Sequence, residues 1–120
     1  MSHIVQIQTR IKDELAVAAA CRRLAIAEPT HGTAELFSGK VTGLLVQLPD
    51  WKYPAVIDTT TGTIQFDNYE GRWGDERALD RFVQMYAIEK AKIEARRQGH
   101  AVSERALEDG TIMLQVQVGP

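Results

Sequence analysis

The feature that most constrains the fold is a long amphipathic helical pattern that follows a short loop rich in glycine and aromatic residues. The helix is predicted to begin at a cap near Asp75 and to end near Gln98, just before Gly99. Its apolar face contains residues at three- and four-residue spacing, namely Leu79, Phe82, Val83, Tyr86 and Ile93. Because a stripe of this length needs a layer to cover it, the pattern predicts a sheet packed against the helix.

A first strand and a shorter helix are predicted before this feature. Alternating apolar and polar residues, many of them β-branched, predict a strand over residues 4–11. Asp13 is a favoured cap for the helix that follows, and Pro29 and Gly32 mark where it has ended. The many alanines of this helix make a narrow apolar stripe, which suits close packing on a sheet.

Hairpins dominate the rest of the chain. Strands are predicted over residues 34–37, 41–48, 53–58, 63–66, 101–107 and 111–118. Glycine-containing turns at 59–62 and 108–110 join four of these strands into two hairpins. The order β-α-β-β-β-β-α-β-β therefore predicts one α+β domain over residues 1–120. We expect a two-layer sandwich in which a mainly antiparallel β-sheet carries two α-helices on one face.

Composition and charge exclude several classes of protein. A formal charge of −2 and a pI near 5.9 provide no general attraction to nucleic-acid phosphates. The single cysteine, Cys21, excludes an intrachain disulfide, and no apolar run is long enough to span a membrane. Because the N-terminal residues lack the basic and apolar blocks of a signal peptide, we expect a cytoplasmic protein.

Three short stretches resemble an uncharacterised family of bacterial and plastid proteins. They are Met1–Thr9, Gln84–Ala87, and Asp109–Ile112 with Leu114 and Val116. The resemblance is to the family of the conserved plastid reading frame ycf thirty-five, whose bacterial relatives share a domain of unknown function. It implies no activity and no cofactor, and it implies a cytoplasmic or stromal protein. Because bacterial members sometimes lie beside AAA-type ATPases, it also implies an adaptor with such a partner.

Two loops are predicted to bring aromatic, basic and amide side chains to one end of the sheet. The candidate binding residues are Trp51, Lys52, Tyr53, Asn68, Tyr69, Arg72 and Trp73. Since Trp, Tyr and Arg dominate binding hot spots, these residues predict a platform for a peptide, a base or a planar ligand. Either tryptophan can instead be a buried plug at the start of the long helix. We favour that interpretation for Trp73 and weigh the two evenly for Trp51.

Catalytic and metal-binding patterns are weak. Carboxylates gather around the same loop, so a small-molecule enzyme with a site at the Asp67–Asp75 loop is the alternative hypothesis. His3, His31 and His100 have no further ligand at metal-site spacing, and no metal or cofactor is expected. Cys21 lies on the apolar helix stripe and is interpreted as structural.

Weak RNA binding along the long helix is a further alternative. Its basic residues are Lys90, Lys92, Arg96, Arg97 and His100. Glu89 and Glu94 interrupt them, which is more typical of a solvated face than of a phosphate-binding stripe. The leading hypothesis is a non-catalytic protein-interaction or adaptor module. We expect it to bind a protein partner, or itself, through the aromatic loop or the solvated sheet face.

Overall fold

The computed structural model describes residues 3–118 and confirms the predicted fold class and element order. The strands are β1 (Val5–Gln8), β2 (Thr30–Leu36), β3 (Gly39–Val46), β4 (Ala55–Asp58), β5 (Thr63–Phe66), β6 (Ala101–Ala106) and β7 (Ile112–Gln117). The helices are α1 (Glu14–Arg23), α2 (Glu76–Arg97) and the short 3₁₀ helix η1 (Tyr69–Gly71). Within residues 3–118, no helix combines the length and the apolar character that crossing a membrane requires.

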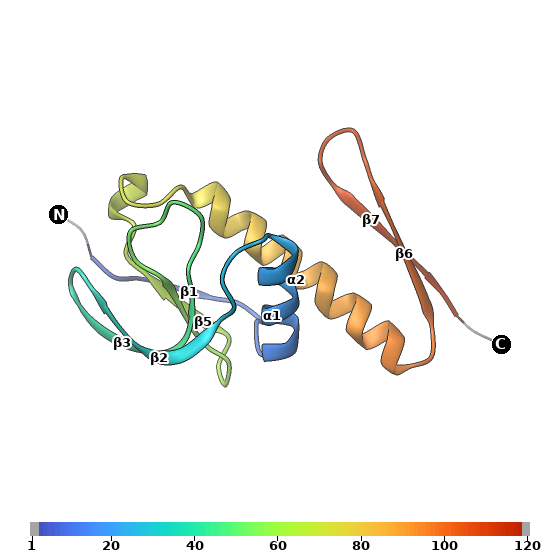
Figure 1. The fold of residues 1–120 in the computed structure, drawn as a ribbon, viewed down its shortest axis with the longest axis horizontal. Helices are drawn as coiled ribbons and strands as arrows, with labels where there is room; N and C mark the ends of the chain where they lie inside the picture. Colours follow the sequence, from blue (N-terminus) through green and yellow to red (C-terminus); the bar gives the residue numbers. More distant parts are fainter. Residues whose placement is uncertain (1–2, 119–120) are drawn as a thin grey trace.

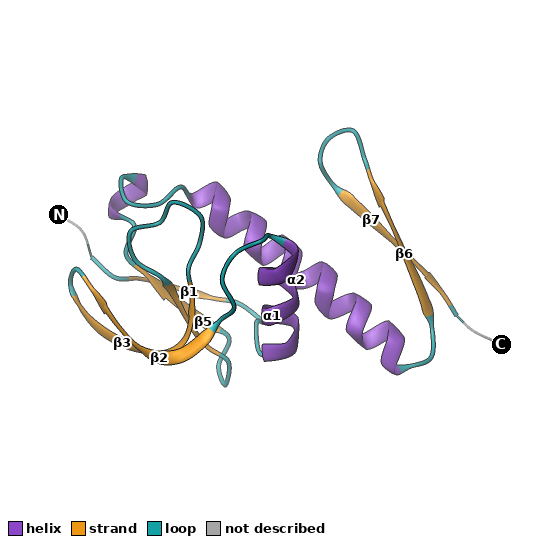
Figure 2. Cartoon of the chain, viewed as in Figure 1, coloured by secondary structure: helices purple, strands orange, loops and turns teal. Residues whose placement is uncertain are grey.

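Five strands form one antiparallel sheet in the order β1-β5-β4-β3-β2 (Figures 1 and 2). Its register follows the apolar alternation of the sequence, because Leu44, Ile57, Ile64 and Ile7 lie side by side across four strands. These side chains share one hydrophobic core with residues from both α1 and α2. Both helices therefore cover the same face of the sheet, as predicted.

The long helix packs as its pattern predicts. Phe82 is fully buried, Leu79 and Tyr86 are also buried, and Val83 and Ile93 lie half-buried at the margin of the stripe. Each helix begins at the expected cap. The Asp13 carboxylate accepts hydrogen bonds from two backbone N–H groups of α1, and that of Asp75 accepts one from Arg77 N.

The hairpin of β2 and β3 curls over the other face of the sheet (Figure 1). Ala34 and Leu36 are buried there against Val56, in a second and smaller core. The predicted strand at 34–37 is longer at its start and one residue shorter at its end. Leu36 pairs with Gly39, and Phe37 therefore lies in a two-residue turn. This turn places an aromatic side chain at the tip of the hairpin.

The C-terminal hairpin forms a separate two-stranded sheet along α2, which gives the molecule extents of 55 × 32 × 23 Å (Figure 1). Ile112 and Leu114 pack against the main core, as the alternation predicts. The same alternation predicts that Val116 and Val118 also face inward, but this prediction is wrong, because their side chains are 44% and 73% exposed. Within residues 3–118, strand β7 pairs with β6 alone, and the side chains at its C-terminal end are exposed.

Candidate functional site

Two loops meet at the end of the sheet where α2 begins. Their backbones are tied directly, because Lys52 N donates a hydrogen bond to Trp73 O at 2.8 Å. Inside the second loop, Asn68 O accepts from Trp73 N at 2.9 Å, and the Asn68 side-chain amide donates to Gly74 O at 3.2 Å. Asn68 is 2% exposed. This candidate binding residue therefore holds the loop from within rather than facing solvent.

Trp51 is the buried plug at this end of the core. Its ring is 5% exposed, packs edge-on against Phe66 with 5.6 Å between centroids, and donates from Nε1 to Asp75 O at 3.0 Å. Gly74 leaves room for it, since a Cβ at that position would lie 2.4 Å from Trp51 Cδ2. The structure thus places Trp51 in the core and Trp73 at the surface. The sequence prediction favoured burial of Trp73, and this preference is wrong.

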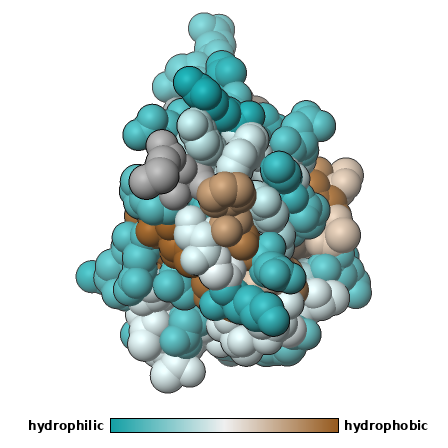
Figure 3. All heavy atoms as spheres, turned by 90° about the vertical axis from the view of Figure 1, so that its left-hand side faces the viewer, coloured by the Kyte–Doolittle hydropathy of each residue, from teal (hydrophilic) through white to brown (hydrophobic). Residues whose placement is uncertain are grey.

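Trp73 is the centre of an exposed aromatic cluster. Its ring centroid lies 4.9 Å from that of Tyr69, 5.3 Å from that of Phe37 and 5.7 Å from that of Tyr53. The Phe37 side chain is 63% exposed, and the other three residues are half-buried. Figure 3 views this end of the molecule, where brown and pale residues meet inside a border of hydrophilic ones.

Two cations lie over the rings of this cluster. Lys52 Nζ is 4.5 Å from the Trp73 centroid and 5.5 Å from that of Tyr53, and Arg72 Cζ is 4.9 Å from the Tyr69 centroid. Both are cation–π distances. Neither cation forms an ion pair with a carboxylate of residues 3–118. We call the six residues Phe37, Lys52, Tyr53, Tyr69, Arg72 and Trp73 the aromatic patch.

The loop that presents the patch has an unusual backbone. Tyr69, Glu70 and Gly71 are consecutive residues with φ of 48°, 53° and 97°. The left-handed region is readily adopted by glycine, whereas an L side chain there costs about 1–2 kcal/mol per residue. The tyrosine and the glutamate therefore store strain, which the hydrogen bonds around Asn68 hold in place.

Phe37 is the patch residue that the sequence prediction missed. It was included in a short predicted strand, although the Ser38-Gly39 pair after it marks a turn. A phenylalanine at a hairpin turn has no neighbouring strand to bury it. The position of Phe37 directly before a Ser-Gly turn was therefore the sequence signal that indicated an exposed aromatic residue.

The carboxylates of the Asp67–Asp75 loop occupy separate environments. Asp67 is buried, and its oxygens lie 3.4 Å from Ser38 Oγ and from Tyr69 N. Asp75 caps α2 and pairs with Arg77 at 2.8 Å, and Glu70 is exposed. Of these three carboxylates in the site of the alternative enzyme hypothesis, one is buried, one caps α2 and one is exposed to solvent. They therefore do not form a pair of neighbouring carboxylates.

Two of the remaining candidates, His31 and Cys21, belong to other elements, the start of β2 and helix α1. Within residues 3–118, no group of three or more His, Cys, Asp or Glu side chains is placed to hold a metal ion. His31 Nε2 contacts Glu14 at 2.8 Å on the surface. Burial raises the pKa of the Cys21 thiol to about 11, which agrees with the structural interpretation of this residue.

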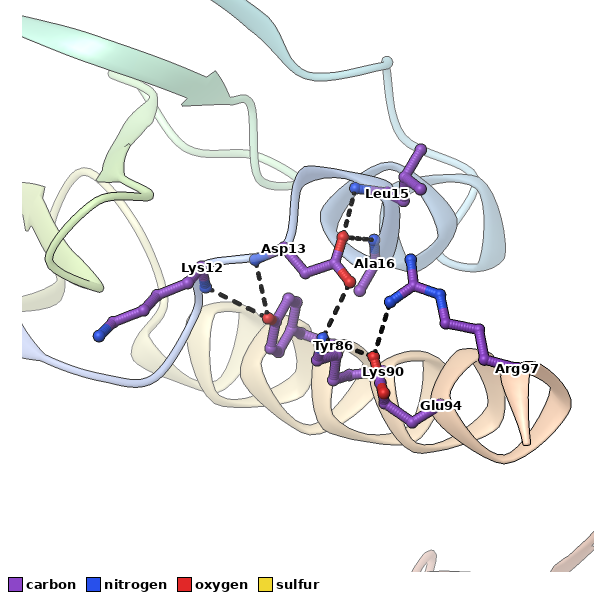
Figure 4. A network of polar contacts seen from close by, with 8 residues as sticks. All are labelled: Lys12, Asp13, Leu15, Ala16, Tyr86, Lys90, Glu94 and Arg97. Carbon is purple, nitrogen blue, oxygen red and sulfur yellow. Dashed lines mark hydrogen bonds and ion pairs between the residues drawn. The ribbon is translucent and has the colours of Figure 1, made fainter.

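The basic stretch of α2 is largely neutralised by carboxylates (Figure 4). Lys90 Nζ lies 3.0 Å from both Asp13 and Glu94, and Arg97 pairs with Glu94 at 2.8 Å. Burial acts to raise the pKa of Asp13, but the hydrogen bond and charge of Lys90, with the capping N–H groups, lower it overall. The Tyr86 hydroxyl accepts from two backbone N–H groups just before α1. This network joins the two helices.

Comparison with known proteins adds no family to these observations. No protein-family model, curated protein or solved structure matches the chain. The resemblance to the plastid and bacterial family therefore stays a prediction.

Proposed function

We propose that the chain is a non-catalytic protein-interaction module that binds an extended segment of a partner protein on the aromatic patch. The observation that carries this proposal is the Trp73 cluster, in which three aromatic rings surround one tryptophan at the surface. Lys52 lies over the Trp73 ring and Arg72 over the Tyr69 ring, and neither forms an ion pair within residues 3–118. Residues of these types dominate binding energy at protein interfaces. Exposed aromatic rings do not stabilise the isolated chain, and exposed apolar patches mark interaction sites.

The chemistry of the patch favours an acidic segment with prolyl or aromatic side chains. Clustered aromatic rings bind the flat faces of proline and of other rings, and surfaces of this kind recognise extended peptide segments. Lys52 and Arg72 add two positive charges that the described chain does not neutralise. A carboxylate of the partner would form ion pairs with these two side chains at the rim of the interface. Charge at the rim affects specificity and association rate more than affinity.

Strain in the loop that carries Tyr69 supports a role for this loop in binding, in addition to reversing the direction of the chain. A glycine or asparagine would adopt the left-handed conformation of Tyr69 and Glu70 at lower cost. The loop instead keeps a tyrosine whose ring contacts Trp73 and Arg72. A surface fixed before binding loses less conformational entropy when the partner docks.

The test is selection of short random peptides on the immobilised protein, followed by affinity measurement with synthetic copies of the selected peptides. We expect peptides that combine Asp or Glu with proline or aromatic residues. Trp73→Ala should weaken their binding by roughly tenfold or more, and Arg72→Ala by less. Leu15→Ala is the matched control, because Leu15 is 64% exposed in α1 and apart from the patch.

Two results would contradict the proposal. One is a selected peptide whose affinity is the same for Trp73→Ala and the wild type. The other is Trp73-dependent binding of single-stranded oligouridylate with no peptide binding, since aromatic rings beside cations also stack nucleic-acid bases. An AAA-type ATPase, the partner class implied by the family resemblance, is the first whole protein to test in the same assay.

A further inference from the structure

Strand β7 of the C-terminal hairpin has a free edge. A two-stranded hairpin is marginally stable by itself, and this one leans on α2 through β6. Strand β7 pairs with β6 on one side, and on its other side no element of the described chain forms more than minor contact (Figures 1 and 2). Its outer backbone groups are therefore left for water or for another strand.

The sequence of β7 lacks the devices that protect edge strands. Residues 111–118 contain no charged side chain and no proline, although proteins use both to block edge pairing. The two edges of the main sheet are better protected. Strand β1 has only four residues, and β2 carries His31 and Glu35.

The direction of the free backbone groups follows from the hairpin turn. Leu107 N donates to Thr111 O at 2.8 Å, which makes these opposed residues a hydrogen-bonded pair. Pairs alternate along an antiparallel ladder. The N–H and C=O groups of Ile112, Leu114 and Val116 therefore point away from β6, toward the free edge.

We infer that β7 pairs with β7 of a second copy of this chain, antiparallel and two-fold symmetric about Gln115. In this register Leu114 lies opposite the second copy's Val116, and Ile112 lies opposite its Val118. These pairs use the outward-pointing backbone groups, and they place apolar side chains together on one face. Gln115 faces its own equivalent as a non-hydrogen-bonded pair, in which side chains approach most closely.

A second copy fits this edge because the strand is its own complement. Apart from Met113, the apolar and polar residues of 112–118 alternate. The reversed strand therefore places the apolar residues opposite one another on one face, and Met113 lies opposite the second copy's Gln117 on the other face. No charged residue meets another across the junction. The carboxylate of Glu104, on β6, is already bound by Arg23 and Lys92 within its own chain. A symmetric contact of this kind closes on itself as a dimer.

The expected dimer is weak and depends on concentration. The area that one strand edge and two exposed valines would bury is smaller than the about 800 Å² per partner that stable complexes bury. The exposed fractions of Val116 and Val118, 44% and 73%, should fall on pairing. Association should therefore be fast to reverse, and it should be visible in sedimentation velocity at high concentration of the full chain.

Charge at Gln115 provides the test. Gln115→Lys and Gln115→Glu each place like charges face to face, so each variant should dimerise roughly tenfold or more weakly than the wild type. An equimolar mixture of the two should regain the dimer, since opposite charges then meet. Ser103→Lys is the matched control, because Ser103 lies opposite Gln115 on β6 and outside the junction. Circular dichroism of each variant reports whether the hairpin folds.

Each outcome decides the inference. Loss of dimer in both single variants, recovery in the mixture and an unchanged Ser103→Lys support pairing in this register. A wild-type chain that stays monomeric at all accessible concentrations overturns it. A dimer that is indifferent to charge at Gln115 also overturns it, and so does one that is lost equally in Ser103→Lys.

Discussion

Replacing each of the two tryptophans by alanine should separate the buried plug from the exposed ring. A tryptophan buries up to about 250 Å², and at about 25 cal/mol per Å² this area contributes about 6 kcal/mol as an upper bound. Trp51 is 5% exposed, so we expect Trp51→Ala to lower the free energy of unfolding by about 3–5 kcal/mol. The hydrogen bond from Nε1 to Asp75 O adds about 1 kcal/mol. Trp73 is half-buried at the surface, and Trp73→Ala should cost no more than about half as much.

Thermal and urea unfolding measure this difference. For a chain of 120 residues, the entropy of unfolding is about 0.25 kcal/mol/K. A loss of about 4 kcal/mol in Trp51→Ala therefore corresponds to a fall in Tm of about 16 °C. Single-tryptophan variants give an independent measurement, because the chain has only these two tryptophans. In Trp73→Phe the remaining emission should be blue-shifted and protected from acrylamide, whereas in Trp51→Phe it should be red-shifted and quenched. Equal destabilisation by the two alanine variants, or better protection of Trp73, would refute the assignment.

Three further perturbations test the core, the loop and the hairpin. Phe82→Ala removes a fully buried ring and should cost about 3–5 kcal/mol in urea unfolding; an unmoved transition would mean that the helix face is wrong. Gly74→Ala should cost about 1–3 kcal/mol by forcing the Trp51 ring to move, and less when combined with Trp51→Phe in a double-mutant cycle. Hydrogen bonds from Arg23, and then from a lysine of α2, lower the pKa of Glu104 from 4.5 to about 2. Because the folded-state pKa is the lower one, this stabilisation is complete above about pH 4.5 and is lost as the pH falls toward 2. Glu104→Gln should remove that part of the pH dependence, and identical acid titrations of both proteins would contradict the role of the ion pairs.

Most of the fold could be predicted because its signals are local. The caps at Asp13 and Asp75 and the period of the α2 stripe depend on residues within a few positions of one another. The turn at 59–62 is similarly local, and it joins β4 and β5 as expected. Which layer the last hairpin joins depends instead on partners far away in the sequence. Alternation over 112–118 predicts a strand with one apolar face, but it does not say how far that face is covered.

The burial of Trp51 and the surface position of Trp73 have a specific physical cause. Both residues lie beside turns, so their sequence neighbours predict similar exposure. Gly74 decides the matter, because only a residue without Cβ lets the Trp51 ring enter beneath the start of α2. With that space filled, Trp73 packs on the outside, against Phe37 from a distant turn. A glycine immediately before a helix cap was visible in the sequence, but its contact with residue 51 is a tertiary property.

The two proposed surfaces lie at opposite ends of the long axis of the molecule (Figure 1). Four rings and two cations form a small patch, so a single patch should bind one peptide segment weakly. A dimer joined through β7 would hold two such patches away from the junction, free to bind two segments of one partner or of a partner assembly. Linking two weak sites in this way can raise the overall affinity by about 10²–10⁴ without any new contact, provided that the partner's geometry allows both to bind. Self-association would therefore compensate for the modest size of the aromatic patch. Because the two surfaces share no residue, either proposal can fail while the other stands.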